Sequence, residues 1–167
     1  LLAKYIKIYA KGNVLDMGTG SGIQAEIALN NGCNVLAVDI DKEAVEFAKK
    51  RGIKAVVSDL FGNVKEEFDL IIFNPPYLPE DREEPLDTRL ITTGGKKGHE
   101  VIERFLKDAK NYLKKDGKIL IVFSSLTGNV DNILKKYNYK FECLEEKKLF
   151  FETLYVYLIK PKVYKEN

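Results

Sequence analysis

The residues with the clearest chemical potential are Asn74-Pro75-Pro76-Tyr77, which directly follow the apolar run 70–73. Prolines cannot donate backbone hydrogen bonds and hold φ near roughly −65°, so neither proline can continue a central strand. The carbonyl oxygens of this turn therefore stay available beside the Asn74 carboxamide. Together these acceptors suit a substrate NH2 group, and the carboxyl end of a strand is where α/β proteins bind their ligands.

A second polar constellation is the segment Asp16-x-Gly18-x-Gly20-x-Gly22, which is predicted to lie between a strand and a helix. Small residues let a ligand approach the backbone, and a helix N-terminus offers unpaired N–H groups. The segment lacks the Lys-Ser/Thr pair of a phosphate-binding loop, so a triphosphate ligand is not expected. Asp39 follows the next predicted strand, where its carboxylate can accept both hydroxyls of a ribose. The pattern indicates a nucleoside ligand with an unmodified ribose.

Apolar runs that alternate with amphipathic stretches predict an α/β fold, a parallel sheet with helices on both faces. The expected strands are 14–17, 35–38, 55–57, 70–73 and 118–123, and the expected helices are 2–9, 23–30, 42–50, 99–114 and 130–137. Residues 139–159 predict an antiparallel hairpin that turns at 145–148, followed by a polar tail over 160–167. The long polar connection from 75 to about 98 exceeds the usual length of a structural link, which favours a functional loop.

The composition limits the classes of function. With 167 residues, of which 45% are hydrophobic, the chain is expected to form one domain over 1–167. A net charge of +2 gives no strong attraction to nucleic acid or to a membrane. No apolar stretch approaches the roughly 20 residues of a membrane span. Cys33 and Cys143 lack metal-ligand spacing, which fits a reducing cytoplasm and predicts two buried side chains.

Other conspicuous residues have structural interpretations. The aromatic side chains between Tyr137 and Tyr157 are expected to fill the space against the sheet. His99 is expected to be exposed at a helix start rather than to act as a base. The acidic residues of 80–87 have no His or Cys among them, so no catalytic metal site is expected.

The chain resembles the class I S-adenosylmethionine-dependent methyltransferases. The likeness rests on Asp16-Met17-Gly18-Thr19-Gly20-Ser21-Gly22, Asp39, Ser58-Asp59-Leu60 and Asn74-Pro75-Pro76-Tyr77. Within that class it is similar to the HemK-like N5-glutamine methyltransferases, which modify the Gly-Gly-Gln glutamine of peptide-chain release factors. The segment Gly94-Gly95-Lys96-Lys97-Gly98-His99-Glu100 also resembles a Gly-Gly-x-x-Gly segment of that family. The resemblance implies a Rossmann-like, mostly parallel seven-stranded sheet that ends in an antiparallel C-terminal hairpin.

The resemblance further implies S-adenosyl-L-methionine as the cofactor. The residues that would bind it are Asp16, Gly18, Thr19, Gly20, Gly22, Asp39, Ile40, Asp59, Leu60 and Asn74. Asp16 would face its amino group and sulfonium, and Asp39 would hold its ribose. Asp59 and Leu60 would meet the adenine, with Ile40 on the opposite side.

The catalytic residues that the resemblance implies are Asn74, Pro75 and Tyr77. Asn74 and the Pro75 carbonyl would accept the two N–H bonds of the glutamine amide and align its nitrogen with the methyl carbon, so that orientation supplies most of the rate. Tyr77 would either pack against the acceptor amide or form a wall of the pocket.

Without a large N-terminal substrate domain, the sequence is similar to the archaeal and eukaryotic branch of the family. The resemblance implies work in the cytoplasm with a small zinc-binding activator of the Trm112 type. An acidic segment that usually precedes this domain and helps to close the cofactor site is absent here. Because the chain begins Leu1-Leu2 without an initiator methionine, we expect that an upstream segment is missing.

Other functions stay open at this point. An adenine N6 or cytosine N4 amine of RNA or DNA also presents two N–H donors to Asn74 and Pro75, although nucleic-acid enzymes usually carry more cationic surface. A lysine or a small molecule is a further acceptor class. An inactive cofactor-binding subunit would show an eroded acceptor motif, whereas here the motif is intact.

Overall fold

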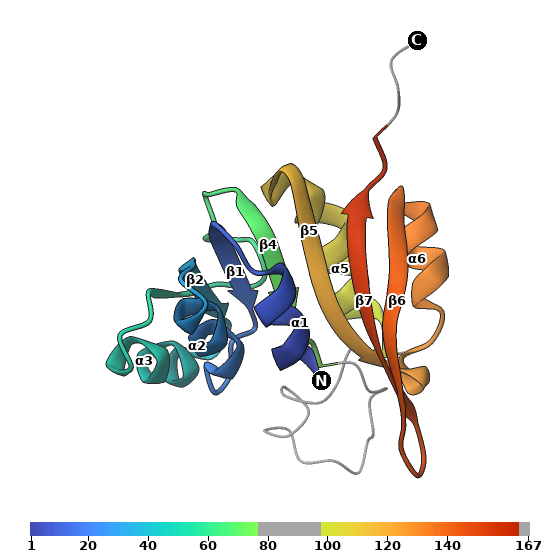
Figure 1. Cartoon of the computed structure of the whole chain (residues 1–167), viewed down its shortest axis with the longest axis horizontal. Coiled ribbons are helices and arrows are strands. Elements are labelled where there is room, and N and C mark those ends of the chain that lie inside the picture. Colours follow the sequence, from blue (N-terminus) through green and yellow to red (C-terminus); the bar gives the residue numbers. More distant parts are fainter. Residues whose placement is uncertain (77–97, 164–167) are drawn as a thin grey trace.

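The computed structural model describes residues 1–76 and 98–163, which fold around one seven-stranded sheet (Figure 1). The helices of this part are α1 (Leu2–Tyr9), α2 (Ile23–Asn30), α3 (Lys42–Lys50), α5 (Glu100–Ala109) and α6 (Val130–Lys136), with 3-10 turns η1 (Lys110–Tyr112) and η2 (Ser125–Thr127). The strands are β1 (Asn13–Met17), β2 (Asn34–Asp39), β3 (Ala55–Val57), β4 (Phe68–Phe73), β5 (Leu113–Ser124), β6 (Tyr139–Lys148) and β7 (Thr153–Pro161).

The strand order is β3-β2-β1-β4-β5-β7-β6. The first five strands of this order pair in parallel, whereas β7 pairs antiparallel with both β5 and β6. The predicted fold class, a mostly parallel sheet with an antiparallel C-terminal hairpin, is therefore confirmed. The order reverses between β1 and β4, and such a switch point is where open α/β sheets bind ligands.

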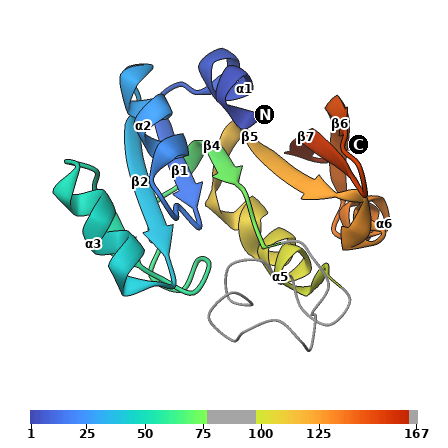
Figure 2. The same ribbon diagram turned by 90° about the horizontal axis from the view of Figure 1, so that it is seen from below.

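Each central strand buries both of its faces because successive side chains point to opposite sides of the sheet. In β4, Ile71 and Phe73 join the core under α5 and α6, while Leu70 and Ile72 join the core under the other helices. Figure 2 shows α1 and α2 on one side of the sheet and α5 and α6 on the other. This two-sided burial explains why the strands appear in the sequence as continuous apolar runs.

Four neighbouring strands end at one level of the sheet. Met17 of β1 pairs with Val38 of β2 and with Phe73 of β4. Asp39, which ends β2, pairs with Val57 at the end of β3. The segments that follow these strands therefore leave the sheet side by side, within about 14 Å across three strand spacings.

The predicted helix 99–114 is too long. It ends as an α-helix at Ala109, and β5 begins at Leu113, where that residue pairs with Phe68. The pairing then shifts between Phe68 and Leu70, because residues 114–117 bulge out of β5 with Asp116 at φ +63°. The apolar spacing of this segment fits a helix, but pairing with β4 determines its conformation.

The C-terminal hairpin turns later than predicted. Residues 145–148, expected to form the turn, continue β6, and the turn lies at 149–152, where the Leu149 N–H donates to the Glu152 carbonyl at 2.8 Å. Charged residues are tolerated in β6 because it is an edge strand of the sheet. The predicted tail is also shorter, since Lys160 and Pro161 still pair with β6.

Two predictions of burial are wrong. Phe150 and Phe151 are 92% and 85% exposed, although Tyr139 and Tyr157 of the same hairpin are buried as expected. Cys143 on the edge strand β6 is exposed, whereas Cys33 is buried. The phenylalanines are exposed because the tip of the hairpin projects past the rest of the sheet (Figure 1), whereas Cys143 is exposed on the edge strand β6.

No helix in the ranges 1–76 and 98–163 is long and apolar enough to cross a membrane.

Tyr139 ties α5 to the hairpin and should be important for stability. Its buried hydroxyl donates to the Leu106 carbonyl at 2.6 Å and accepts from the Lys110 N–H at 3.1 Å. We expect Tyr139→Phe to lower the free energy of unfolding by about 1–3 kcal/mol, because two backbone groups lose their partner. Urea unfolding measures this change. Tyr137→Phe is the control, since that half-buried hydroxyl bonds only the Glu103 carboxylate, and an equal loss in both variants would contradict the assignment.

Candidate active site

The predicted ligand-binding segments converge at the carboxyl edge of the parallel strands. The glycine-rich loop follows β1, Asp39 ends β2, Asp59 comes two residues after β3, and Asn74 directly follows β4. Backbone hydrogen bonds join these segments, from the Thr19 N–H to the Val38 carbonyl and from the Ser58 N–H to the Asp39 carbonyl, both at 2.9 Å. The structure therefore brings together residues that are up to 58 positions apart in the sequence.

The buried carboxylate of Asp16 holds the glycine-rich loop. One oxygen accepts from the Thr19 hydroxyl at 2.7 Å and from the Ala25 N–H in the first turn of α2 at 3.1 Å. Asp16 thus supplies the first turn of α2 with an acceptor, because the N-cap residue Gly22 has no side chain to do so. Gly18 and Gly22 have φ values of +65° and +80°, which disfavour other residues.

Burial raises the pKa of Asp16 from 3.8 to about 7, against the lowering effect of its hydrogen bonds to Thr19 and Ala25. The nearby carboxylate of Asp39 raises this pKa further. A cation bound at this edge would favour the ionised form of Asp16. The electrostatics of the site therefore suit a positively charged ligand.

Asp39 lies at the mouth of the site, only partly buried. One of its oxygens accepts from the Gly20 N–H and the other from the Asp41 N–H, each at 2.9 Å. These bonds fix the carboxylate beside the glycine-rich loop. Ile40, the next residue, is 63% exposed and so presents an apolar surface at the same edge.

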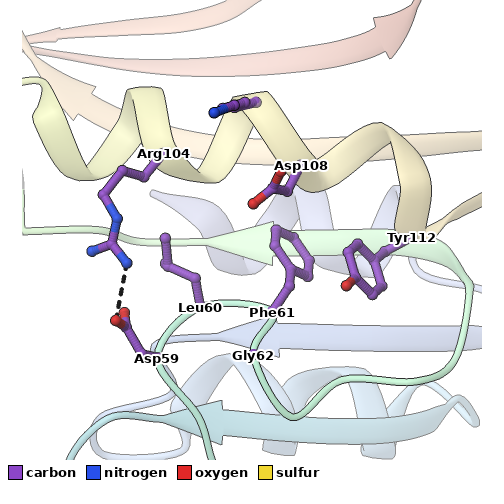
Figure 3. A pocket seen from close by; sticks show the side chains of 8 residues that line it. Asp59, Leu60, Phe61, Gly62, Arg104, Asp108 and Tyr112 are labelled. Carbon is purple, nitrogen blue, oxygen red and sulfur yellow. Dashed lines mark hydrogen bonds and ion pairs between the residues drawn. The ribbon is translucent and has the colours of Figure 1, made fainter.

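Asp59 and Leu60 border a groove of about 380 Å³ between the segment after β3 and helix α5 (Figure 3). The exposed Asp59 carboxylate accepts a hydrogen bond from Arg104 Nη2 at 2.9 Å. Leu60 has a φ of +47°, and the buried Ser58 hydroxyl stabilises this turn by donating to the Leu60 carbonyl at 2.6 Å. The far wall of the groove is Phe61 stacked on Tyr112, with ring centroids 4.4 Å apart.

The acceptor motif begins as predicted, directly after the buried end of β4. Asn74 is exposed, Pro75 is buried and Pro76 is partly buried. Tyr77 and the predicted segment Gly94 to Lys97 lie outside the described residues. His99 is only partly exposed, and its Nδ1 is buried without a hydrogen-bond partner, so the expectation of an exposed histidine is only partly met.

Arg104 is the site residue that sequence reasoning missed. Its ion pair with Asp59 joins residues 45 positions apart, and both partners are more than half exposed. Neither a motif nor helical spacing indicates such a pair, because it depends on how α5 crosses the sheet. Ser58 belongs to the motif Ser58-Asp59-Leu60, and its side chain stabilises the turn that carries Asp59 and Leu60.

The donor set fits a cationic nucleoside cofactor such as S-adenosylmethionine. Asp16, Asp39 and Asp59 place three carboxylates along one edge, and the Asp16–Asp39 repulsion would be relieved by a sulfonium and an ammonium group. Among the residues that the structure describes, no group of three His, Cys, Asp or Glu side chains could hold a metal ion.

Comparison with known proteins agrees with this interpretation. Residues 1–152 match the family model described as methyltransferase small domain. The chain is 39% identical over 167 residues to a Methanocaldococcus jannaschii protein named as a candidate protein N5-glutamine methyltransferase, covering 93% of this chain and 85% of that one. It is also 33% identical over 124 residues to the release factor glutamine methyltransferase of Streptococcus pneumoniae, which covers 65% of this chain but only 44% of that longer protein.

A solved structure resembles the whole fold. It is the Mtq2–Trm112 complex of E. cuniculi, which is responsible for methylation of the translation termination factor eRF1. The TM-score is 0.75 at 28% identity, and the match covers 96% of this chain and 93% of that one.

The raised pKa of Asp16 predicts a specific dependence of stability on pH. Because the folded chain holds this proton more tightly than the unfolded chain, the contribution of Asp16 to the free energy of unfolding falls as the pH rises from about 4 to about 7 and levels off above that. Asp16→Asn keeps an acceptor for Thr19 and Ala25 but removes the titration. We therefore expect a smaller difference in the free energy of unfolding between about pH 5 and about pH 8 in the variant, measured by urea unfolding.

The control for this measurement is Asp41→Asn, at the exposed N-cap of α3, where either side chain can accept from the Glu43 N–H. If both variants change the pH dependence equally, the effect does not belong to Asp16.

Proposed function

Because this chain belongs to the methyltransferase small domain family, we propose that it is an S-adenosylmethionine-dependent N-methyltransferase that modifies N5 of the glutamine in the Gly-Gly-Gln motif of a peptide-chain release factor. The observation that carries the proposal is the position of Asn74 and Pro75, one strand away from the glycine-rich loop across the switch point of the sheet. In this proposal, Asn74 and Pro75 bind the acceptor amide beside the predicted cofactor edge.

In this proposal, the cofactor is held by residues at the ends of β1, β2 and β3 and in the segments that follow them. Gly18 and Gly20 let the loop pass close to its methionine part, Asp39 accepts from the ribose hydroxyls, and Asp59 and Leu60 meet the adenine. When bound, the cofactor supplies an electrophilic methyl group on a sulfonium. Asp16 stabilises the nearby positive charge from beneath the loop.

The acceptor motif orients a weak nucleophile. An amide nitrogen is a poor nucleophile because its lone pair is delocalised into the carbonyl. The Asn74 side chain and the Pro75 carbonyl accept hydrogen bonds from its two N–H groups, which aligns the nitrogen. These acceptors also stabilise the positive charge that develops on the nitrogen in the transition state. The methyl–nitrogen bond would form as the methyl–sulfur bond breaks, and the cationic nitrogen that results is acidic enough to release one proton to solvent without a strong base. Orientation supplies most of the acceleration.

The partners follow from the relatives. The E. cuniculi relative acts in complex with Trm112 on eRF1, and the S. pneumoniae relative is named for release factors. We extend both features to this chain, with a small zinc-binding activator and a release factor in the cytoplasm. The nearly balanced charge of the chain supports a protein acceptor over a nucleic acid.

The test is transfer of a labelled methyl group from S-adenosylmethionine to purified release factor, RNA and DNA, each with and without a small zinc-binding partner. Labelled release factor, with the label lost when its Gly-Gly-Gln glutamine is changed to Asn, supports the proposal. Label in nucleic acid but not in protein would overturn it.

Asn74→Ala should abolish transfer with little effect on the cofactor. We expect transfer to fall by about 10²-fold or more, because the acceptor amide loses a positioned partner, while the cofactor Kd changes by less than about twofold. Single-turnover transfer and calorimetry measure the two quantities. Asn132→Ala on α6 is the control, since that side chain is also exposed but lies away from the site. Equal loss of transfer and binding would assign Asn74 a mainly structural role.

Asp39→Ala should weaken the cofactor instead. Loss of two charge-assisted hydrogen bonds to the ribose is expected to raise the Kd by tenfold or more, at roughly 1.5–3 kcal/mol for each bond. Asp39→Asn separates this effect from loop disorder, because an amide oxygen can still accept from Gly20 N–H. Calorimetry that shows unchanged affinity for Asp39→Ala would remove the ribose assignment.

A further inference from the structure

The tip of the β6–β7 hairpin is an exposed apolar surface with no role in the site described above. It consists of Leu149, Phe150 and Phe151, which are 43%, 92% and 85% exposed. The two phenylalanine rings contact each other edge to face, with centroids 4.7 Å apart. Such a pair buries little surface in the folded chain itself, so its apolar area is available to a partner.

The tip stands on the same edge of the sheet as the acceptor motif. Phe73 of β4 pairs with Ile121 of β5, and Ser124, three positions further along β5, pairs with Leu154 of β7. Thr153 therefore lies four positions, or about 13 Å, beyond the level of Phe73, and the turn extends further still. Figure 1 shows the hairpin projecting past the rest of the sheet on this side.

The hairpin is held in this position by the segment that follows β5. The Ser124 hydroxyl donates a hydrogen bond to the Glu152 carboxylate, and the Thr153 N–H donates to the Ser125 hydroxyl at 3.0 Å. The turn is closed by the bond from Leu149 to Glu152. An apolar tip that is already ordered loses little conformational freedom on binding, which favours recognition.

The distance and the charge define the kind of partner. The tip is two strands and well over 10 Å away from Asn74, so a free amino acid, a nucleobase or a short peptide held at Asn74 cannot reach it. Around the tip, Glu145 is paired with Lys4 at 2.7 Å, and Glu146 and Glu152 are matched by Lys147 and Lys148, so no excess of positive charge attracts a polyanion. A folded protein that presents a loop to Asn74 spans the distance easily, since a standard interface covers about 800 Å² on each partner.

We infer that Phe150 and Phe151 form a docking element for an apolar patch on the folded protein that carries the acceptor glutamine. The inference rests on the proposed function, and it adds that recognition of the folded acceptor occurs partly at the hairpin tip, away from the amide.

The experiment compares two acceptors, purified release factor and a short Gly-Gly-Gln peptide that cannot span the distance to the hairpin tip. We expect the double variant Phe150→Ser/Phe151→Ser to raise the KM for release factor by about tenfold or more, as for truncated apolar anchors at an interface. The kcat, the cofactor Kd and transfer to the peptide are expected to stay unchanged. Phe150→Leu/Phe151→Leu, which keeps the surface apolar, should restore most of the affinity.

The control is Ile8→Ser on α1, another exposed apolar residue, at 67% exposure. An unchanged KM for release factor in the double serine variant would overturn the inference, as would an equal loss with both acceptors or with Ile8→Ser. Concentration-dependent dimers of the wild type that disappear in the variant without a change in KM would assign the tip to a second copy of this chain. If the wild type labels neither acceptor, the proposed function itself fails, which is distinct from a selective effect of the variant.

Discussion

The buried carboxylate of Asp16 connects strand β1, the glycine-rich loop and the start of helix α2. The backbone pairing of β1 alone would not fix the position of the loop and the helix. From the second-last position of β1, the carboxylate accepts hydrogen bonds from the Thr19 hydroxyl in the glycine-rich loop and from the Ala25 N–H in the first turn of α2. Asp16, in the preceding strand, thus takes the place of a side-chain N-cap at the start of α2. The loop and the helix are therefore positioned by the same carboxylate. Burial and the nearby Asp39 carboxylate disfavour the ionised form of Asp16 and raise its pKa. A cationic ligand would offset this unfavourable effect.

The sheet topology places the two proposed binding segments on either side of the switch point between β1 and β4. In the proposed function, the loop after β1 binds the cofactor and the motif after β4 binds the acceptor. The two strands are direct neighbours at the point where the strand order reverses. Both segments begin from fully buried strand ends, Met17 and Phe73, which are 2% exposed. Rigid strand ends fix the spacing between the two groups, which is the requirement of a reaction that relies on orientation.

The sequence predicted what depends on local pattern. The strand, loop and helix over 13–30 were recognised because apolar runs, glycines and an acid follow one another in order, and the sheet topology followed from the family resemblance. The bulge at 114–117 was not recognised, since its spacing satisfies a helix and only pairing with β4 excludes one. The Asp59–Arg104 pair and the exposure of Phe150 depend on how distant elements lie, and no short window of sequence contains that information.

The two ends of the described chain lie at opposite ends of the strands, one near the carboxyl ends of the parallel strands and one near their amino ends (Figure 1). Because α1 precedes β1 and runs against it, Leu1 lies near the edge that carries the site, whereas β7 leaves the sheet at Pro161 on the far edge. A fluorescent label, an affinity tag or a sensor surface attached after residue 163 would therefore leave the binding edge facing solution. The same attachment before Leu1 would stand beside that edge and compete with a macromolecular acceptor for space.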